Sequence, residues 1–166
     1  AITSTTVPGR MELISYGKNK KVFVDYAHTS DALERVLENI RPICKGELRV
    51  LFGCGGDRDK GKRALMAVAA ENGADVVYVS SDNPRTENPT AIIADVLNGF
   101  KNRDRVVVEE DRKNAIEKAL MDMNKHDCLV VAGKGHEDYQ IIGTEKHPFD
   151  DREIVRASIQ SETIRA

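Results

Sequence analysis

The chain has few aromatic residues, few cysteines and no long apolar run, and each shortage excludes a class of protein. Aromatic residues make up 5% of the chain, too few for a platform that stacks nucleic-acid bases. The three cysteines, Cys44, Cys54 and Cys128, form no C-x-x-C pair, so we expect neither a redox motif nor a metal site. The apolar runs are too short to cross a membrane, and the N-terminus lacks the order of a secretory signal. We therefore expect a cytoplasmic protein with no nucleic-acid partner and no membrane contact.

The chain also lacks a strong charge of either sign. Its 25 basic and 27 acidic residues leave a formal charge of -2, so any anionic ligand must be held by local basic groups. The length of 166 residues, 40% of them hydrophobic, fits one compact domain that buries its own core. We expect a monomer, with residues 1–10 as a linker from a preceding domain and residues 11–166 as the domain itself, because Ser, Thr, Pro and Gly dominate the first segment.

Short apolar runs alternate with amphipathic segments along the chain, a pattern typical of an α/β protein. The strand candidates are Val22–Val24, Arg49–Phe52, Val76–Val79, Val106–Val108 and Leu129–Val131, with Met11–Ile14 as a further strand that can run antiparallel. Helical patterns cover Leu33–Ile40, Lys62–Asn72, Ile92–Phe100 and Ile116–Met123, and another begins near Asp150. Apolar strands joined through helices tend to run parallel and to be covered on both faces. The pattern predicts a doubly wound, mostly parallel sheet of about six strands with helices on both faces.

Four of the strand candidates run directly into polar loops of unusual composition. These loops are Asp25–His28, Gly53–Arg58, Ser81–Arg85 and Gly133–Glu137. Because the carboxyl ends of parallel strands meet at one edge of a sheet, we expect the four loops to form a single rim. The opposite connections have the composition of ordinary turns. This asymmetry predicts a ligand site on the rim.

The most informative loop is Asp82-Asn83-Pro84-Arg85. Pro84 fixes the turn and favours an extended Asn83, so that the flanking side chains can point in different directions. Arg85 can clamp a carboxylate with two hydrogen bonds, while Asp82 and Asn83 can accept hydrogen bonds from an ammonium group. A zwitterionic amino acid would satisfy both. The alternative is a well-capped turn in which Arg85 merely pairs with Glu87.

Two further charges on the rim favour the amino-acid interpretation. Arg58 supplies a second cation and Glu137 a second anion, each from a different loop. His28 and His136 also follow strands, but no other histidine or cysteine stands at ligand spacing, which argues against zinc. We expect both histidines to pack on their loops or to bind substrate.

The segment Gly56–Arg63 has the spacing of a phosphate loop, G-x-x-x-x-G-K. It departs from that pattern where Arg63 replaces the serine or threonine that holds magnesium, and where Asp57 and Asp59 place carboxylates inside the loop. A kinase-like nucleotide site on this loop stays open as an alternative. Neither glycine-rich loop completes the dinucleotide pattern G-x-G-x-x-G, which disfavours a nicotinamide or flavin enzyme.

Taken in order, the four loops resemble those of the C-terminal domain of the Mur ligases. The resemblance runs from the joint at residues 7–12 to the last helix, and Asp82-Asn83-Pro84-Arg85 resembles the motif of members that select meso-diaminopimelate over lysine. It implies an ATP-dependent ligase of peptidoglycan synthesis. In such an enzyme, a preceding domain holds the UDP-N-acetylmuramoyl dipeptide, a central domain holds ATP and Mg²⁺, and this domain closes over both. The implied reaction forms an acyl phosphate that the amine of the incoming amino acid attacks.

The resemblance also assigns roles to residues of this chain. Contacts to meso-diaminopimelate fall on Arg58, Asp82, Asn83, Pro84, Arg85, Gly133 and Glu137. Arg85 would hold the distal carboxylate and Glu137 the distal ammonium, whereas Asp25 and His28 match a loop near the nucleotide. No catalytic residue is expected in this domain alone, so the isolated domain should be inactive. A non-catalytic amino-acid sensor remains a second alternative.

Overall fold

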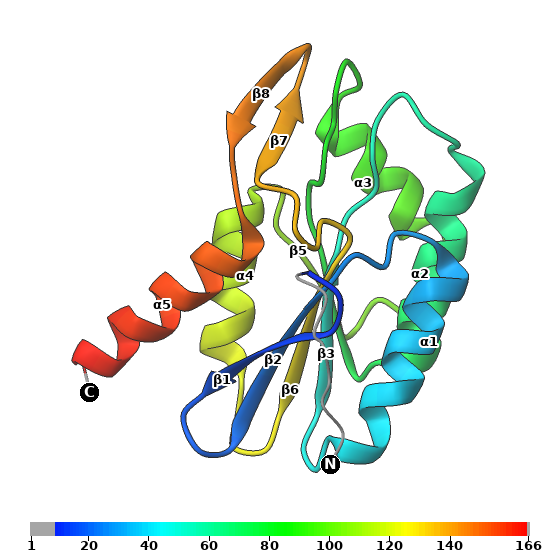
Figure 1. Cartoon of the computed structure of the whole chain (residues 1–166). Helices are drawn as coiled ribbons and strands as arrows, with labels where there is room; N and C mark the ends of the chain where they lie inside the picture. The colour runs from blue at the N-terminus through cyan, green and yellow to red at the C-terminus, as the bar shows by residue number, and fades with distance from the viewer. Residues whose placement is uncertain (1–8, 166) are drawn as a thin grey trace.

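The computed structural model describes residues 9–165, so most of the expected linker lies outside the described residues. A six-stranded sheet in the order β1-β2-β6-β3-β4-β5 forms the centre of the fold (Figure 1). Its strands are β1 Glu12–Tyr16, β2 Lys20–Asp25, β3 Leu48–Phe52, β4 Val76–Val79, β5 Val106–Val108 and β6 Cys128–Ala132. β1 is antiparallel to β2, and the remaining pairs are parallel. The predicted α/β architecture and strand number are confirmed.

Helices cover both faces of the sheet, as Figure 1 shows. The helices are α1 Ser30–Ile40, α2 Gly61–Gly73 and α3 Pro89–Leu97 on one face, and α4 Arg112–Asp122 and α5 Asp151–Arg165 on the other. A short 3-10 helix, η1 Arg41–Ile43, follows α1. Successive strand residues point to opposite faces, so Phe23 joins the core under α1 to α3, while Val22 and Val24 join the core under α4. This double burial explains why the strands are apolar throughout.

Three helices, α1, α3 and α4, begin with a side-chain cap. Asn88 and Asp111 cap α3 and α4 by accepting hydrogen bonds from backbone amides in the first turn. At α1 the cap is Thr29, whose hydroxyl accepts from the amide of Ala32 at 3.2 Å. Ser30 is the first helical residue. The predicted helical stretch to Phe100 is too long: α3 ends at Leu97, although Phe100 is buried.

A separate two-stranded hairpin, β7 Tyr139–Ile142 and β8 Glu145–Pro148, was not predicted. It follows the loop after β6 and stands above the sheet edge in Figure 1. Its strands lack fully buried positions, so they have no continuous apolar run to reveal them. The hairpin bears directly on the rim, because an isolated bridge pairs Arg85 with Ile142.

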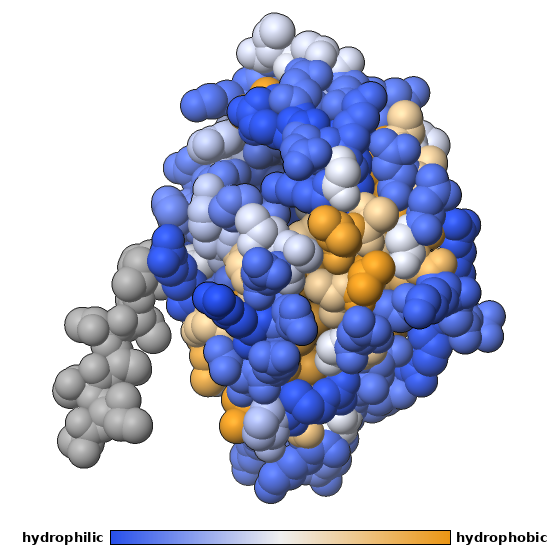
Figure 2. Space-filling view, turned by 90° about the vertical axis from the view of Figure 1, so that its right-hand side faces the viewer, coloured by the Kyte–Doolittle hydropathy of each residue, from blue (hydrophilic) through white to orange (hydrophobic). Residues whose placement is uncertain are grey.

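The outer surface is mainly polar. Figure 2 shows a largely hydrophilic face with a small apolar group near its centre, and α2 exposes Leu65 and Val68. Within residues 9–165, no helix is long and apolar enough to cross a membrane.

Candidate functional site

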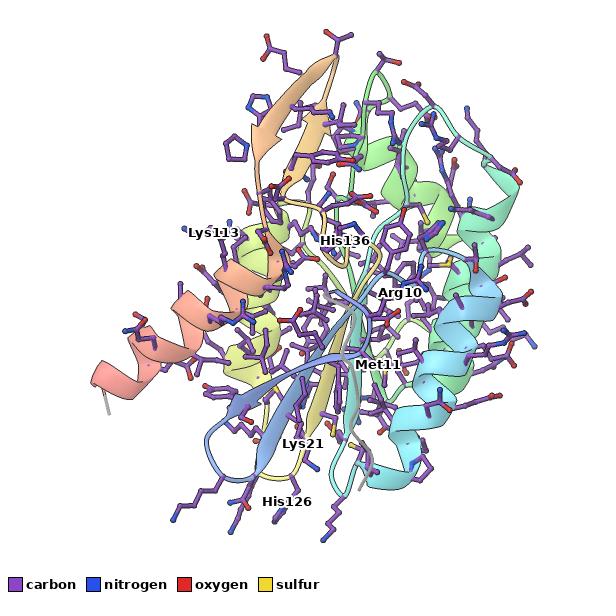
Figure 3. All side chains as sticks on the ribbon, viewed as in Figure 1. Arg10, Met11, Lys21, Lys113, His126 and His136 are labelled. Atoms are coloured by element: carbon purple, nitrogen blue, oxygen red, sulfur yellow. The ribbon has the colours of Figure 1, made fainter. Side chains whose placement is uncertain are left out.

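The four polar loops lie together at one edge of the sheet, as predicted. Parallel pairing aligns the ends of β2 and β6 at Asp25 and Ala132, and those of β3 and β4 at Phe52 and Val79. Each loop therefore leaves the sheet on the same side. Figure 3 shows His136 at this edge, with Lys21 and His126 at the opposite end.

The glycine-rich loop after β3 packs backbone to backbone against the loop after β4. The amide of Gly56 donates to the carbonyl of Asn83 at 2.8 Å, and a methyl group on Gly56 would overlap the carbonyl of Pro84. A methyl group on Gly55 would lie 2.8 Å from Nη1 of Arg85. Glycine is needed at position 56 because the contact there is with backbone, whereas a side chain at position 55 would have to displace the end of the Arg85 side chain.

Two arginines gather around this glycine pair. Nη1 of Arg85 donates to the carbonyl of Gly56 at 3.0 Å, and the side chain of Arg58 flanks the Cβ position of Gly55 at 3.8 Å. Arg58 is exposed and Arg85 is half-buried. The two arginines thus place cationic side chains from neighbouring loops around one glycine.

The backbone of Arg85 adopts the left-handed conformation, with φ +52, which is uncommon for a residue with a side chain. The hairpin holds it there: the Arg85 amide donates to Ile141 at 3.1 Å, and its carbonyl accepts from Gly143 at 2.7 Å. Asp57, on the facing loop, has φ +55. Such strain persists where surrounding contacts over-determine it, and it is frequent at binding sites.

The pairing of Arg85 with Glu87, which the plain-turn alternative invoked, is contradicted by the structure. Glu87 pairs with Arg63 at 3.0 Å, and Arg63 also reaches Asp95 at 2.9 Å. The hydrogen bond from Arg63 holds the pKa of Glu87 below its usual value. Arg63 is buried and donates to the carbonyl of Gly55 at 3.1 Å, so it supports the glycine-rich loop of the rim.

The phosphate-loop alternative is not favoured by the same contacts. Four of the eight amides of the loop already donate within the chain: those of Gly56, Asp57, Gly61 and Arg63 bond, respectively, to Asn83, Glu87, Asp59 and Lys60. A phosphate loop instead turns its free amides toward the anion. The loop here serves the rim as a scaffold.

An acceptor cluster lies beside the arginines and surrounds Lys134, which the sequence did not single out. Nζ of Lys134 lies 3.0 Å from Oδ1 of Asn83, 3.3 Å from Oδ1 of Asp82 and 3.5 Å from Oε2 of Glu137. A methyl group on Gly133, which has φ +114, would lie 3.3 Å from Oδ2 of Asp82. The predicted anionic residues therefore come together, with an internal cation among them.

Strand β7 adds three residues that sequence reasoning missed. The side-chain amide of Gln140 donates to the Asp82 carbonyl at 2.7 Å, and the amide of Ile141 donates to Oδ1 of Asn83 at 2.9 Å. The charge of Glu137 is the largest cause that raises the pKa of Tyr139. The aromatic and β-branched residues of the Tyr-Gln-Ile-Ile stretch were the available signal for this strand.

The loop after β2 positions its residues mainly for structure. Asp25 is buried, and its two oxygens accept from the amides of Met11 and Ala27, each at 2.7 Å. His28 is exposed, with Nδ1 2.9 Å from the carbonyl of Tyr26. Since a carbonyl only accepts, Nδ1 is the donor and Nε2 stays open to a ligand. The ring of Tyr26 lies between those of His28 and His136, at 4.6 and 5.8 Å. Across residues 9–165, no group of three or more His, Cys, Asp or Glu could hold a metal ion.

Comparison with known families agrees with this arrangement of fold and rim. The family model described as Mur ligase, glutamate ligase domain, matches residues 9–135. The chain therefore belongs to the Mur ligase family, through its glutamate ligase domain.

Several similar curated proteins carry one name, UDP-N-acetylmuramoyl-L-alanyl-D-glutamate–2,6-diaminopimelate ligase. The protein of that name from Haemophilus influenzae (strain PittEE) is 53% identical over 148 residues, covering 89% of this chain and 30% of the relative. The one from Gloeobacter violaceus is 51% identical over 160 residues, covering 96% and 33%. The chain thus spans about a third of the length of these relatives.

Solved structures extend the comparison. A structure of a ligase with the same name superposes with a TM-score of 0.90 at 44% identity, covering 95% of this chain and 32% of the other. A folylpolyglutamate synthase/dihydrofolate synthase from Yersinia pestis, complexed with AMPPNP and Mn, reaches a TM-score of 0.59 at 19% identity, covering 78% and 29%. The second likeness shows a shared fold alone.

Proposed function

We propose that the chain is the amino-acid-binding, nucleotide-covering domain of UDP-N-acetylmuramoyl-tripeptide synthetase. This ligase forms the amide bond that adds meso-diaminopimelate to UDP-N-acetylmuramoyl-L-alanyl-D-glutamate in peptidoglycan synthesis. The relatives that carry the corresponding name support the proposal, because they are about half identical over most of this chain. The observation that carries it is the meeting of cations and anions on neighbouring loops of one rim.

The rim matches the charges at the distal end of diaminopimelate, which bears a carboxylate and an ammonium on one carbon. Arg85 and Arg58 are proposed to bind the carboxylate from the side of the glycine-rich loop. Asp82 and Glu137 are proposed to accept from the ammonium. The charges of Glu137 and Arg85 both act on the nearby Tyr139, the first raising its pKa and the second lowering it. Lysine has an ammonium but no distal carboxylate, so it would leave the arginines without a partner.

This chain offers few side chains that could bind ATP or its metal ion. Both carboxylate oxygens of Asp25 accept hydrogen bonds from backbone amides, whereas His28 is an exposed polar side chain of the same loop. We propose that ATP and Mg²⁺ are held mainly by a central domain outside this chain, with His28 approaching the nucleotide when the domains close. The UDP-linked dipeptide would likewise bind outside this chain. A cytoplasmic, monomeric ligase is part of the same proposal, and residues 1–10 would connect the two domains.

The proposal is tested by titrating the 166-residue chain with meso-diaminopimelate and with L-lysine while following amide chemical shifts. We expect meso-diaminopimelate to shift the rim loops and to bind at least tenfold more tightly than lysine. Arg85→Ala should remove most of that preference, because a charge-assisted hydrogen bond contributes about 1.5–3 kcal/mol. Arg103→Ala, an exposed arginine away from the rim, is the matched control. Equal binding of both ligands, or shifts confined to the opposite edge, would contradict the proposal.

A further inference from the structure

We infer that Lys134 is a positioning residue of the amino-acid site, whose buried ammonium ion gathers Asp82, Asn83 and Glu137 into one acceptor cluster with charge left for a single ligand ammonium. The inference rests on the function proposed above. Lys134 follows β6 within two residues, and its side chain is fully buried, whereas those of Asp82 and Glu137 are 12% and 19% exposed. The ammonium ion therefore lies inside the molecule, while both carboxylates keep access to solvent.

The hydrogen bonding of the cluster is complete on the lysine side. A lysine ammonium has three donors, and three acceptors lie within 3.5 Å of Nζ, one each from Asn83, Asp82 and Glu137. Full burial of lysine is rare without such pairing. These contacts use Oδ1 of Asp82 and Oε2 of Glu137, so the second oxygen of each carboxylate is left to a ligand. The side-chain oxygen of Asn83 has no lone pair left for a ligand, because it accepts from Lys134 and also from the Ile141 amide.

These two internal hydrogen bonds change the role of Asn83, which was expected to accept from the ligand ammonium. An amide oxygen has two lone pairs, and here Lys134 and Ile141 occupy them. Nδ2 of the same side chain points to Oε2 of Glu137 at 3.5 Å. Asn83 therefore orients Glu137 and the hairpin, and the ligand ammonium is left to the two carboxylates.

Formal charge gives the second argument. Two carboxylates and one lysine ammonium leave the cluster at -1, which one ligand ammonium neutralises. Arg112 also acts electrostatically on Asp82 and Glu137, but its guanidinium is already paired with Asp151. Without Lys134 the two carboxylates would repel each other across the cluster. The lysine thus sets both the spacing and the charge of the ammonium subsite.

The test is chemical rescue of Lys134→Ala in the 166-residue chain. The deleted atoms correspond to n-propylammonium, and n-propanol is a neutral control of nearly equal size. Two readouts are followed by NMR: the affinity for meso-diaminopimelate, and hydrogen exchange of the Ile141 amide, which reports on Asn83 without any ligand. We expect at least a tenfold loss of affinity and faster exchange, both largely restored by propylammonium and by neither propanol nor buffer salt. Lys134→Met, which keeps the packing, should show the same losses and guards against misfolding of the alanine variant.

The outcomes separate this inference from the proposed function. If propanol restores both readouts as well as propylammonium does, Lys134 acts by packing alone and the inference fails. It also fails if the wild type binds meso-diaminopimelate and either Lys134 variant binds it equally or more tightly, in which case the proposed function stands. If the wild type does not bind meso-diaminopimelate but propylammonium restores Ile141 protection, the proposed function fails while the ordering of the cluster by Lys134 stands.

Discussion

The ion pair between Arg112 and Asp151 is expected to control both the stability of the fold and the geometry of the rim. Both side chains are completely buried, and two hydrogen bonds of 2.9 and 2.8 Å join them. The same guanidinium donates to the carbonyl of Ala132 at 3.0 Å and to that of Ser81 at 3.4 Å. Ser81 and Ala132 immediately precede Asp82 and Gly133, so this pair holds the starts of two rim loops.

Asp151→Asn keeps the shape of the side chain but leaves the charge of Arg112 buried without its partner. Breaking a buried pair in this way costs about 3–5 kcal/mol. For a chain of this length, that loss lowers the melting temperature by roughly 6–20 °C, at about 2–4 °C per kcal/mol. We also expect weaker binding of meso-diaminopimelate, because the Ser81 and Ala132 carbonyls lose a fixed donor.

The measurement is urea unfolding followed by far-ultraviolet circular dichroism. Glu117→Gln is the control: it breaks an exposed pair with Lys113 on the same helix, 3.9 Å apart, and should cost under about 0.5 kcal/mol. Arg112→Met combined with Asp151→Leu should recover most of the lost stability, because it removes both buried charges. If the free energy of unfolding of Asp151→Asn lies within about 1 kcal/mol of that of Glu117→Gln, then leaving Arg112 without its partner has little cost. That result would refute the reasoning.

Three other predictions follow from single contacts. Gly56→Ala should broaden or shift the rim amides, because its methyl group would overlap the Pro84 carbonyl. Gly17→Ala, in the turn between β1 and β2, places its methyl group in open space and strains only its own backbone at φ +65, so it should leave the rim amides unchanged. An unchanged rim spectrum in Gly56→Ala would contradict this prediction. Burial raises the pKa of Asp75, but hydrogen bonds from Arg41 and from the Leu48 amide outweigh it and bring the pKa below the usual 3.8. The contribution of Asp75 to stability is therefore complete above pH 3.8 and is lost as the pH falls further, so Asp75→Asn should flatten the acid limb of a plot of unfolding free energy against pH. Burial raises the pKa of Cys54 to about 12, so iodoacetamide at pH 8 should label Cys54 far more slowly than the less buried Cys44, which peptide mass spectrometry can check.

The local pattern of the sequence was enough to predict the sheet and the place of the rim. The run Val76–Val79 coincides with β4, and Val106–Val108 coincides with β5. Strand and helix periods depend on near neighbours in the chain, and parallel strands must release their loops at one edge. The proximity of Arg58 to Arg85, and of Asp82 to Glu137, followed from that topology.

Tertiary structure alone decided which side chain meets which on the rim. Lys134 reaches Asn83 across 51 positions, and Ile141 reaches the same side chain across 58. Glu87 lies two residues from Arg85 yet pairs with Arg63, while Arg85, with its left-handed backbone, donates to the carbonyl of Gly56. Side-chain direction and burial depend on packing between distant segments. The local sequence therefore predicted which residue types the rim carries. Which charges can bind a ligand and which support the rim depends on the packing of the loops against one another.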